Sequence, residues 1–257
     1  MSNAVPARPA ALPQTNLQLY RLMIEMGYQP DDIVRVTHGY GLAMQLFSGR
    51  YRACGKPFVC HLVGTAAVLA WLRAPVTSVV CGLLHAAYAE GDFGSASHGM
   101  TPMKRERLRR VVGDEAESLI VDYTTSSRTA TALVAAHASF ASLSPRRREI
   151  LVVQLANELD DFRDWAPHFA RNADNRLDGL RMSRSQQIEM AQSLGYPALA
   201  AALRETYDDC LASPAIPSAL RSNEANGYTL VPASAGTRLP VRVMGIARRV
   251  LRRLRRS

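Results

Sequence analysis

The chain has 257 residues, of which 47% are hydrophobic and 21% charged, a composition typical of a folded protein large enough to bury a core. Its longest apolar stretches, residues 59–72 and 79–88, are shorter than the ~20 residues that a membrane-spanning helix needs. The N-terminus also has too little apolar length for a secretory signal, so we expect a cytoplasmic protein without a transmembrane helix.

The formal net charge of +9 is concentrated at the C-terminus. Residues 241–257 carry seven arginines and no acidic residue, so the rest of the chain is close to neutral. This distribution weakens the case for a nucleic-acid-binding body, which a pI near 9.8 would otherwise favour.

Apolar residues recur at helical spacing along most of the chain, whereas no stretch alternates over the length of a strand. The pattern predicts an all-α fold with residues 17–211 as one domain, between a flexible N-terminus at 1–16 and a linker at 212–239. Ser144 and Pro145 are typical of a helix start. The predicted helices cover residues 17–26, 31–47, 59–72, 76–88, 104–112, 114–121, 146–159, 185–194 and 198–211.

Residues 240–257 are predicted to form a basic amphipathic helix, because apolar residues repeat at three- and four-residue steps between arginines. Such a helix suits an anionic membrane surface, which would place the protein peripherally at the inner face of the membrane. Nucleic acid is a less favoured partner, since no aromatic residue is interleaved for base stacking. Docking of the helix on its own domain is the remaining alternative.

Two histidines are the first candidates for chemistry. His61 begins the helix predicted at 59–72, and His85 lies near the end of the helix at 76–88. An antiparallel pair of helices would bring the two imidazoles together at one end, and imidazole binds several divalent metals. The alternative is that both are buried core histidines without a ligand.

The residues around these histidines resemble a known family. One segment is similar to the R-x-x-G-x-P-Y-x-x-H motif of the hydrolase domain in RelA/SpoT-type enzymes, a branch of the HD metallohydrolase superfamily; its matching residues are Arg52, Gly55, Pro57 and His61. Residues 82–86, G-L-L-H-A, are similar to the L-L-H-D motif that comes later in that domain. Residues 153–161, V-Q-L-A-N-E-L-D-D, are similar to the K-L-A-D-R-L-x-N motif of the same family. The chain also resembles an uncharacterised bacterial HD-like family with a second motif close to G-L-F-H-S-x-Y-G-T. The resemblance implies an HD-domain-like helical bundle.

Carried over residue by residue, the resemblance implies a divalent metal, Mn, Fe or Zn, held by His61, His85 and Asn157. Two carboxylates of the family's metal site are missing, because Ala86 replaces the aspartate after the second histidine and Asn157 replaces the third ligand. An amide carbonyl ligates a cation without contributing charge, so the implied metal motif is degenerate.

The resemblance also suggests catalytic and substrate-binding residues. Glu90 and Asp92 are candidates for the catalytic carboxylates, although an acidic surface loop is the simpler interpretation. Arg52 and Lys56 are candidates for binding a nucleotide base or phosphate. Tyr88, one helical turn after His85, is a candidate for closing the pocket, or else a core aromatic residue.

Two functions follow as hypotheses. The first is a metal-dependent phosphohydrolase that acts on a nucleotide or a small phosphoester. The second is a non-catalytic HD-like protein that kept the helical pocket and binds a ligand or a partner.

Overall fold

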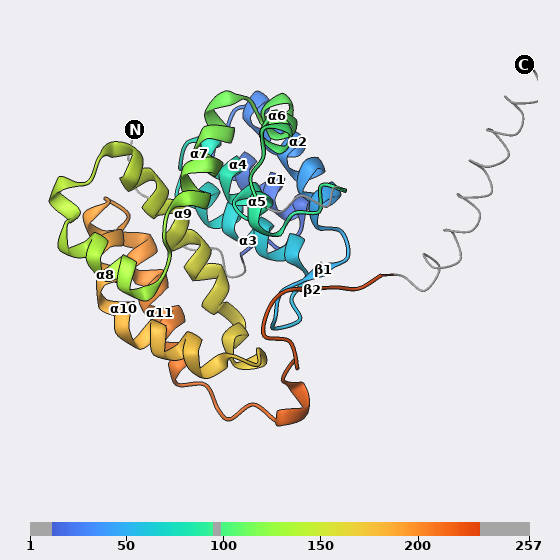
Figure 1. Ribbon diagram of the computed structural model, residues 1–257. Coiled ribbons are helices and arrows are strands. Elements are labelled where there is room, and N and C mark those ends of the chain that lie inside the picture. Colours follow the sequence, from blue (N-terminus) through green and yellow to red (C-terminus); the bar gives the residue numbers. More distant parts are fainter. Residues whose placement is uncertain (1–11, 95–98, 232–257) are drawn as a thin grey trace, which may run out of the picture.

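The computed structural model describes residues 12–94 and 99–231, and these residues form a bundle of helices (Figure 1). The predicted all-α class is confirmed. No described helix is long and apolar enough to cross a membrane. Most of the flexible N-terminus predicted at 1–16 and the whole basic helix predicted at 240–257 lie outside the described residues.

Helices predominate among the described elements, and each of the two strands is two residues long. In chain order the elements are α1 (Asn16–Glu25), α2 (Pro30–Phe47), β1 (Arg50–Tyr51), α3 (Phe58–Trp71), α4 (Val76–Leu84), α5 (Ala87–Glu90), α6 (Pro102–Val112), α7 (Asp114–Thr125), α8 (Ala130–Ala138), η1 (Phe140–Ser142), α9 (Pro145–Phe162), η2 (Arg163–Phe169), α10 (Ala173–Ser193), α11 (Pro197–Leu211), η3 (Ser218–Leu220) and β2 (Tyr228–Thr229).

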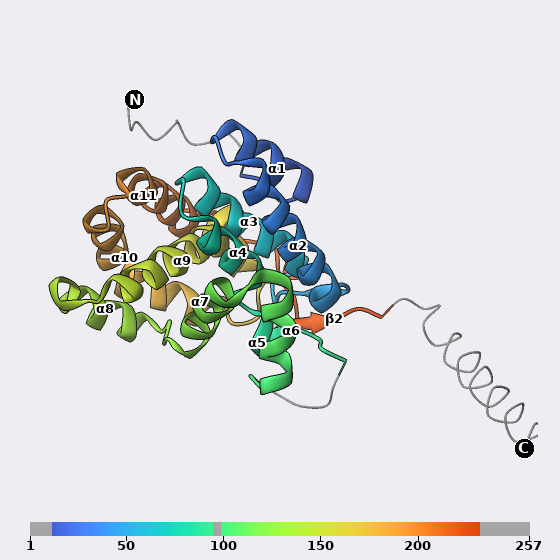
Figure 2. The ribbon, with the colours of Figure 1, turned by 90° about the horizontal axis from the view of Figure 1, so that it is seen from above.

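The helices form two groups that meet at α9. Helices α1 to α4, α6 and α7 pack together on one side, and α8, α10 and α11 pack together on the other (Figure 2). Helix α9 contacts α3, α4 and α7 of the first group and α10 and α11 of the second. Because α9 is enclosed from both sides, charged residues near its C-terminal end are also buried, including Asp160 and Asp161.

Helices α3 and α4 form the closest packed pair of the first group. Gly82 allows this approach, because a Cβ atom there would lie 2.8 Å from a Leu69 methyl carbon and 3.0 Å from the Ala66 Cα atom. The two helices are antiparallel and joined by the short turn at residues 72–75. The start of α3 and the end of α4 therefore lie at the same end of the pair.

The helix start predicted at Ser144 and Pro145 is confirmed. The Ser144 hydroxyl accepts a hydrogen bond from the backbone amide of Arg147 at 3.2 Å, and Pro145 occupies the first helical position of α9. Helix α4 ends at Leu84 rather than continuing to residue 88 as predicted, and α5 is a separate short helix. Ala86, between them, has a backbone conformation outside the helical range.

Among the described elements, two α-helical segments and the short 3-10 helices η1, η2 and η3 were not predicted from the sequence. Helix α8 buries only Leu133 and Ala136, so its small side chains give no clear amphipathic pattern. The first half of α10, before residue 185, is rich in polar residues and contains Gly179. In both segments, packing between α8 and α10 stabilises helices whose own sequence gives a weak signal.

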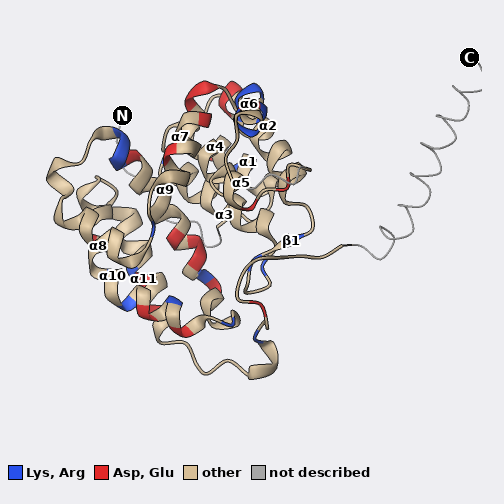
Figure 3. Ribbon diagram, in the orientation of Figure 1, with Lys and Arg blue, Asp and Glu red and all other residues tan. Residues whose placement is uncertain are grey.

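A buried ion pair joins α5, α6 and α7. The Glu117 carboxylate is 1% exposed and accepts hydrogen bonds from Arg105 at 2.7 and 3.0 Å and from the Tyr88 hydroxyl at 2.7 Å. Burial alone would raise the pKa of Glu117, but the bonds from Arg105 and Tyr88 hold this pKa below its usual value. Figure 3 shows the basic residues of α6 beside the acidic residues at the start of α7.

We predict that Tyr88→Phe destabilises the protein by roughly 1.5–3 kcal/mol, because it removes one hydrogen bond from a buried, ionised carboxylate. The free energy of unfolding from urea titration measures this loss. An unchanged free energy would contradict a structural role for the Tyr88 hydroxyl.

Tyr20→Phe provides a matched control. The Tyr20 hydroxyl is also buried, but it has no hydrogen-bond partner among the described residues. Removing it should leave the free energy of unfolding unchanged or slightly higher.

Candidate functional site

His61 and His85 lie side by side, in agreement with the expectation from their helices. His61 lies in the first turn of α3, and His85 directly follows α4. Their ring centroids are 5.2 Å apart, and the two Nε2 atoms are 3.3 Å apart. Both side chains are buried, His61 fully so.

The other nitrogen of each ring is held by a hydrogen-bond acceptor. The His61 Nδ1 atom lies 2.8 Å from an Asp160 carboxylate oxygen, and the His85 Nδ1 atom lies 2.9 Å from the Gly82 carbonyl oxygen. Since neither acceptor carries a proton to give, both Nδ1 atoms must donate. In the neutral rings, both Nε2 lone pairs then face each other, so the space between them favours a proton or a metal cation.

A proton in this position is disfavoured by the surroundings. Burial lowers the pKa of His85 well below its usual value, and the neighbouring His61 lowers it further. Burial also lowers the pKa of His61, with Arg52 adding to the effect, although Asp161 and Asp160 oppose it. Both rings are therefore neutral at pH 7 in the absence of another cation.

Asp160 anchors His61, and its negative charge is balanced by the Lys56 ammonium. Its carboxylate accepts hydrogen bonds from the Lys56 ammonium at 2.7 Å and from the Gln14 side chain at 3.2 Å. Burial alone would raise the pKa of Asp160, but His61 and Lys56 outweigh this effect and hold the pKa at about 2. Asp160 is thus ionised and fully engaged at neutral pH.

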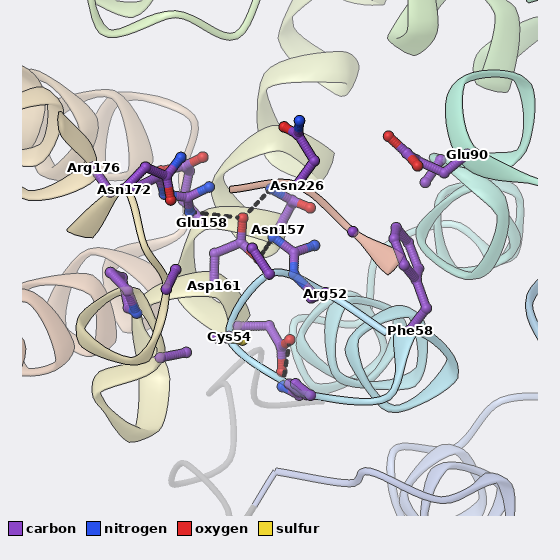
Figure 4. Close-up of a pocket in the computed structure, with 18 of the residues that line it drawn as sticks. Arg52, Cys54, Phe58, Glu90, Asn157, Glu158, Asp161, Asn172, Arg176 and Asn226 are labelled. Atoms are coloured by element: carbon purple, nitrogen blue, oxygen red, sulfur yellow. Dashed lines mark hydrogen bonds and ion pairs between the residues drawn. The ribbon is translucent and has the colours of Figure 1, made fainter. Parts of the chain in front are cut away.

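Asp161 is held by two arginines from opposite sides (Figure 4). Its carboxylate lies 2.7 Å from an Arg52 nitrogen and 3.1 Å from an Arg176 nitrogen. The Asn157 amide donates a long hydrogen bond of 3.5 Å to the same carboxylate. Burial would raise the pKa of Asp161, but Arg52 and the other cations hold it well below its usual range.

These residues border a cavity of about 380 Å³. The walls come from the loop before α3, the end of α4, α5, the loop after α7, α9, η2, the start of α10 and the segment before β2. The lining includes Arg52, Lys56, Phe58, His85, Ala86, Glu90, Arg128, Asn157, Glu158, Asp160, Asp161, Asn172, Arg176 and residues 225–227.

Five of the eight residues expected from the sequence border this cavity, and three do not. Arg52, Lys56, His85, Asn157 and Glu90 are in its wall, and His61 lies behind His85 and Asp160. The Glu90 carboxylate pairs with Arg50 at 2.9 Å.

Tyr88 and Asp92 are absent from the described wall of the cavity. Tyr88 is turned towards Glu117 instead. Asp92 is exposed, and its carboxylate accepts the backbone amide of Gly94 at 2.8 Å, which stabilises a turn.

The histidine pair has two features that fit a pair of metal ligands. Two nitrogens bound at ~2.0–2.1 Å to one tetrahedral metal lie about 3.3–3.4 Å apart, close to the 3.3 Å between the two Nε2 atoms. The bond from His61 to Asp160 has the form typical of metal-ligating histidines. Asn157 offers an amide carbonyl, but Ala86 offers no side-chain ligand. Within the described residues, no group of three or more His, Cys, Asp and Glu side chains is arranged to hold a metal.

Asp160 and Asp161 were not among the site residues predicted from the sequence. They lie three and four positions after Asn157, so they project from the same side of α9, and this spacing was a usable signal. Arg128 and Arg176 gave no signal of this kind, because they come from segments that the sequence did not place near the histidines.

The segment after α11, predicted as part of a linker, runs back across the body (Figure 1). Strand β2 pairs with β1, which places Tyr228 opposite Tyr51 with stacked rings 5.5 Å apart. The Ser222 backbone amide also donates to the Phe169 carbonyl at 2.8 Å. Residues 225–227 thereby become part of the cavity wall.

Comparisons with known proteins give a partial match. A family described as "Domain of unknown function (DUF6817)" matches residues 45–128, less than half of the chain. No curated protein matches the chain. Among solved structures, the chain is similar to one titled "A metazoan ortholog of SpoT hydrolyzes ppGpp and plays a role in starvation responses", with 14% identity and a TM-score of 0.47, over 71% of this chain and 96% of that one.

Gly64 is the position where α3 makes room for Asp160. A Cβ atom there would lie 1.9 Å from an Asp160 carboxylate oxygen. We predict that Gly64→Ala displaces this carboxylate from His61 and destabilises the protein by roughly 1–3 kcal/mol. Urea titration measures the stability, and the NMR shifts of the His61 ring report the lost hydrogen bond.

Gly41→Ala is the matched control, because a Cβ atom in that helix meets nothing within 4 Å. This substitution should stabilise the protein by roughly 0.5–1 kcal/mol through helix propensity. Equal effects of the two substitutions would contradict the role assigned to Gly64.

Proposed function

We propose that this chain is an HD-like phosphohydrolase that binds a nucleotide or another small phosphoester in the cavity and a divalent cation beside it. The observation that supports this proposal most directly is the pair of Nε2 atoms, 3.3 Å apart with both Nδ1 protons already donated. Two lone pairs held face to face in a buried position are stabilised by a shared cation. The neutral state of both rings favours a metal over a proton in this position.

The cation would be held by His61, His85 and the carbonyl oxygen of Asn157. Imidazole ligands suit Zn and Fe, and Mn also accepts mixed nitrogen and oxygen ligands. A divalent cation here would supply Lewis-acid chemistry, lowering the pKa of a bound water and polarising a phosphoryl oxygen. Because Ala86 and Asn157 contribute no charge, the affinity for the cation is expected to be low.

The surrounding residues have separable roles in this proposal. Arg52 lies 5.7 Å over the Phe58 ring, so its guanidinium presents a flat surface for a nucleotide base while its edge pairs with Asp161. Lys56 holds Asp160, which in turn orients His61. Glu90 is a wall carboxylate that pairs with Arg50 and makes no hydrogen bond or ion pair with Asp160 or Asp161 or with their cationic partners, and we assign it as the proton acceptor from the attacking water.

A second candidate is a non-catalytic binding protein with the same pocket. Its support is the loss of charged ligands: Ala86 is in the cavity wall, and Asp160 and Asp161 are already paired with cations. Such a protein would bind its ligand with no metal present. The two candidates therefore differ in metal content and in turnover.

Metal analysis of the purified protein after incubation with Mn, Fe or Zn tests the proposed cation site. We expect bound metal in the wild type, loss of it in His61→Gln, and about 10-fold or higher affinity in Asn157→Asp, which restores a charged ligand. His137→Gln is the control, because this histidine pairs with the exposed Glu189. A wild type that binds no metal, or a His61→Gln variant that retains it, would contradict the cation site.

Hydrolysis is tested with bis(p-nitrophenyl) phosphate and nucleoside polyphosphates on metal-loaded protein. We expect Glu90→Gln to lower kcat about 100-fold, within the range typical of a lost general base, and to leave metal content unchanged. Glu106→Gln is the control, since this residue pairs only with Arg109 and Arg110 on α6 among the described residues. Nucleotide binding to metal-free protein without any turnover would favour the second candidate.

A further inference from the structure

Arg128 is a cavity residue that neither the family resemblance nor the cation site accounts for. It lies in the loop between α7 and α8 and borders the cavity. Its guanidinium lies 5.0 Å over the Tyr123 ring and donates a hydrogen bond to the Tyr123 hydroxyl at 3.1 Å. Tyr123 is fully buried, and its ring packs against His85 with the centroids 5.2 Å apart. Arg128 is thus held in place from one side, next to the histidine pair.

Arg128 differs from the other cations of the wall in its partners. Arg52 and Arg176 both pair with Asp161 (Figure 4). Lys56 pairs with Asp160. In the part of the chain that the structure describes, no carboxylate lies within 4.0 Å of the Arg128 guanidinium, and its one hydrogen bond is to the neutral Tyr123 hydroxyl.

This difference decides which cation is available to an anionic ligand. A ligand that recruits Arg52 or Arg176 has to compete with Asp161, whose own burial makes an unpaired charge costly. A ligand that recruits Arg128 breaks no ion pair. The guanidinium also retains most of its five N–H donors, and their fork geometry matches two oxygens of a phosphoryl group.

We propose that Arg128 is the phosphoryl-binding residue of this cavity and that Tyr123 positions it beside His85. The ligand class is a phosphate or phosphoester anion, with its remaining part directed towards Arg52 and Phe58. The assignment rests on the proposed function for its ligand class and extends it by naming the residue that holds the phosphoryl group. It does not depend on the cation, since none of its contacts involves His61 or Asn157.

The test is isothermal titration calorimetry with inorganic phosphate and pyrophosphate on full-length protein stripped of metal with EDTA. We expect Arg128→Gln to weaken the affinity for pyrophosphate about 10- to 100-fold, the range for a lost charge-assisted pair. The affinity of Arg128→Lys for pyrophosphate should lie between those of the wild type and Arg128→Gln, because lysine keeps the charge and lacks the forked N–H geometry. Tyr123→Phe, which keeps the ring and removes the hydrogen bond, should weaken the affinity several-fold.

Arg148→Gln is the matched control. The Arg148 guanidinium lies 5.1 Å over the Phe140 ring, a stacking geometry close to that of Arg128, but it is outside the described cavity wall. We expect wild-type affinity for pyrophosphate in this variant. Circular dichroism and thermal midpoints of all variants show that they are folded, and Arg128→Lys and Tyr123→Phe keep the test valid if Arg128→Gln unfolds.

Three outcomes would overturn the assignment: no phosphate or pyrophosphate binding by the wild type, equal affinity in the wild type and Arg128→Gln, or an equal loss in Arg148→Gln. These outcomes are separable from a failure of the proposed function. A protein without metal and without turnover that still loses pyrophosphate binding in Arg128→Gln would refute the hydrolase and support Arg128.

Discussion

The hydrogen bond between His61 and Asp160 is the interaction on which the rest of the site depends. It joins α3 to α9 inside the protein, where an unpaired carboxylate would be costly. It also fixes the tautomer of His61, because the Nδ1 proton is donated and the Nε2 lone pair must face His85. Gly64 and Lys56 make the bond possible, the first by leaving space for the carboxylate and the second by neutralising it.

The same requirement for neutralisation limits the chemistry of the acidic end of α9. Asp160 and Asp161 look like metal ligands by residue type, yet both are engaged with cations: Lys56 for the first, Arg52 and Arg176 for the second. To ligate a metal, either carboxylate would have to leave these partners in a buried position. The three donors proposed to hold a cation, His61, His85 and Asn157, are all neutral, so a cation held by them alone would be bound weakly.

Sequence patterns predicted the parts of the fold that depend on local periodicity. Helices α3, α4 and α9 carry strong apolar patterns, and so His61 and Asn157 were placed on the correct helices, whereas His85, predicted within a helix, directly follows α4. The patterns failed where packing rather than local sequence stabilises a helix, as in α8 and the first half of α10. The pairing of the two-residue strands β1 and β2 could not be predicted either, because Arg50 and Thr229 are far apart in sequence and share no recognisable motif.

The cavity is also formed by segments that are far apart in the sequence. The sequence motifs alone would assign metal binding and anion binding to one set of residues, whereas the structure places the candidate residues for each on different segments. The histidine pair comes from adjoining helices at the inner side of the wall, whereas Arg128 and residues 225–227 reach the wall from distant segments. The groups proposed to ligate a metal and the group proposed to bind an anion are thus supplied by different parts of the chain. The absence of a carboxylate at Ala86 would weaken the proposed metal site without affecting Arg128. The proposed affinity for a phosphorylated ligand therefore does not require the proposed hydrolysis.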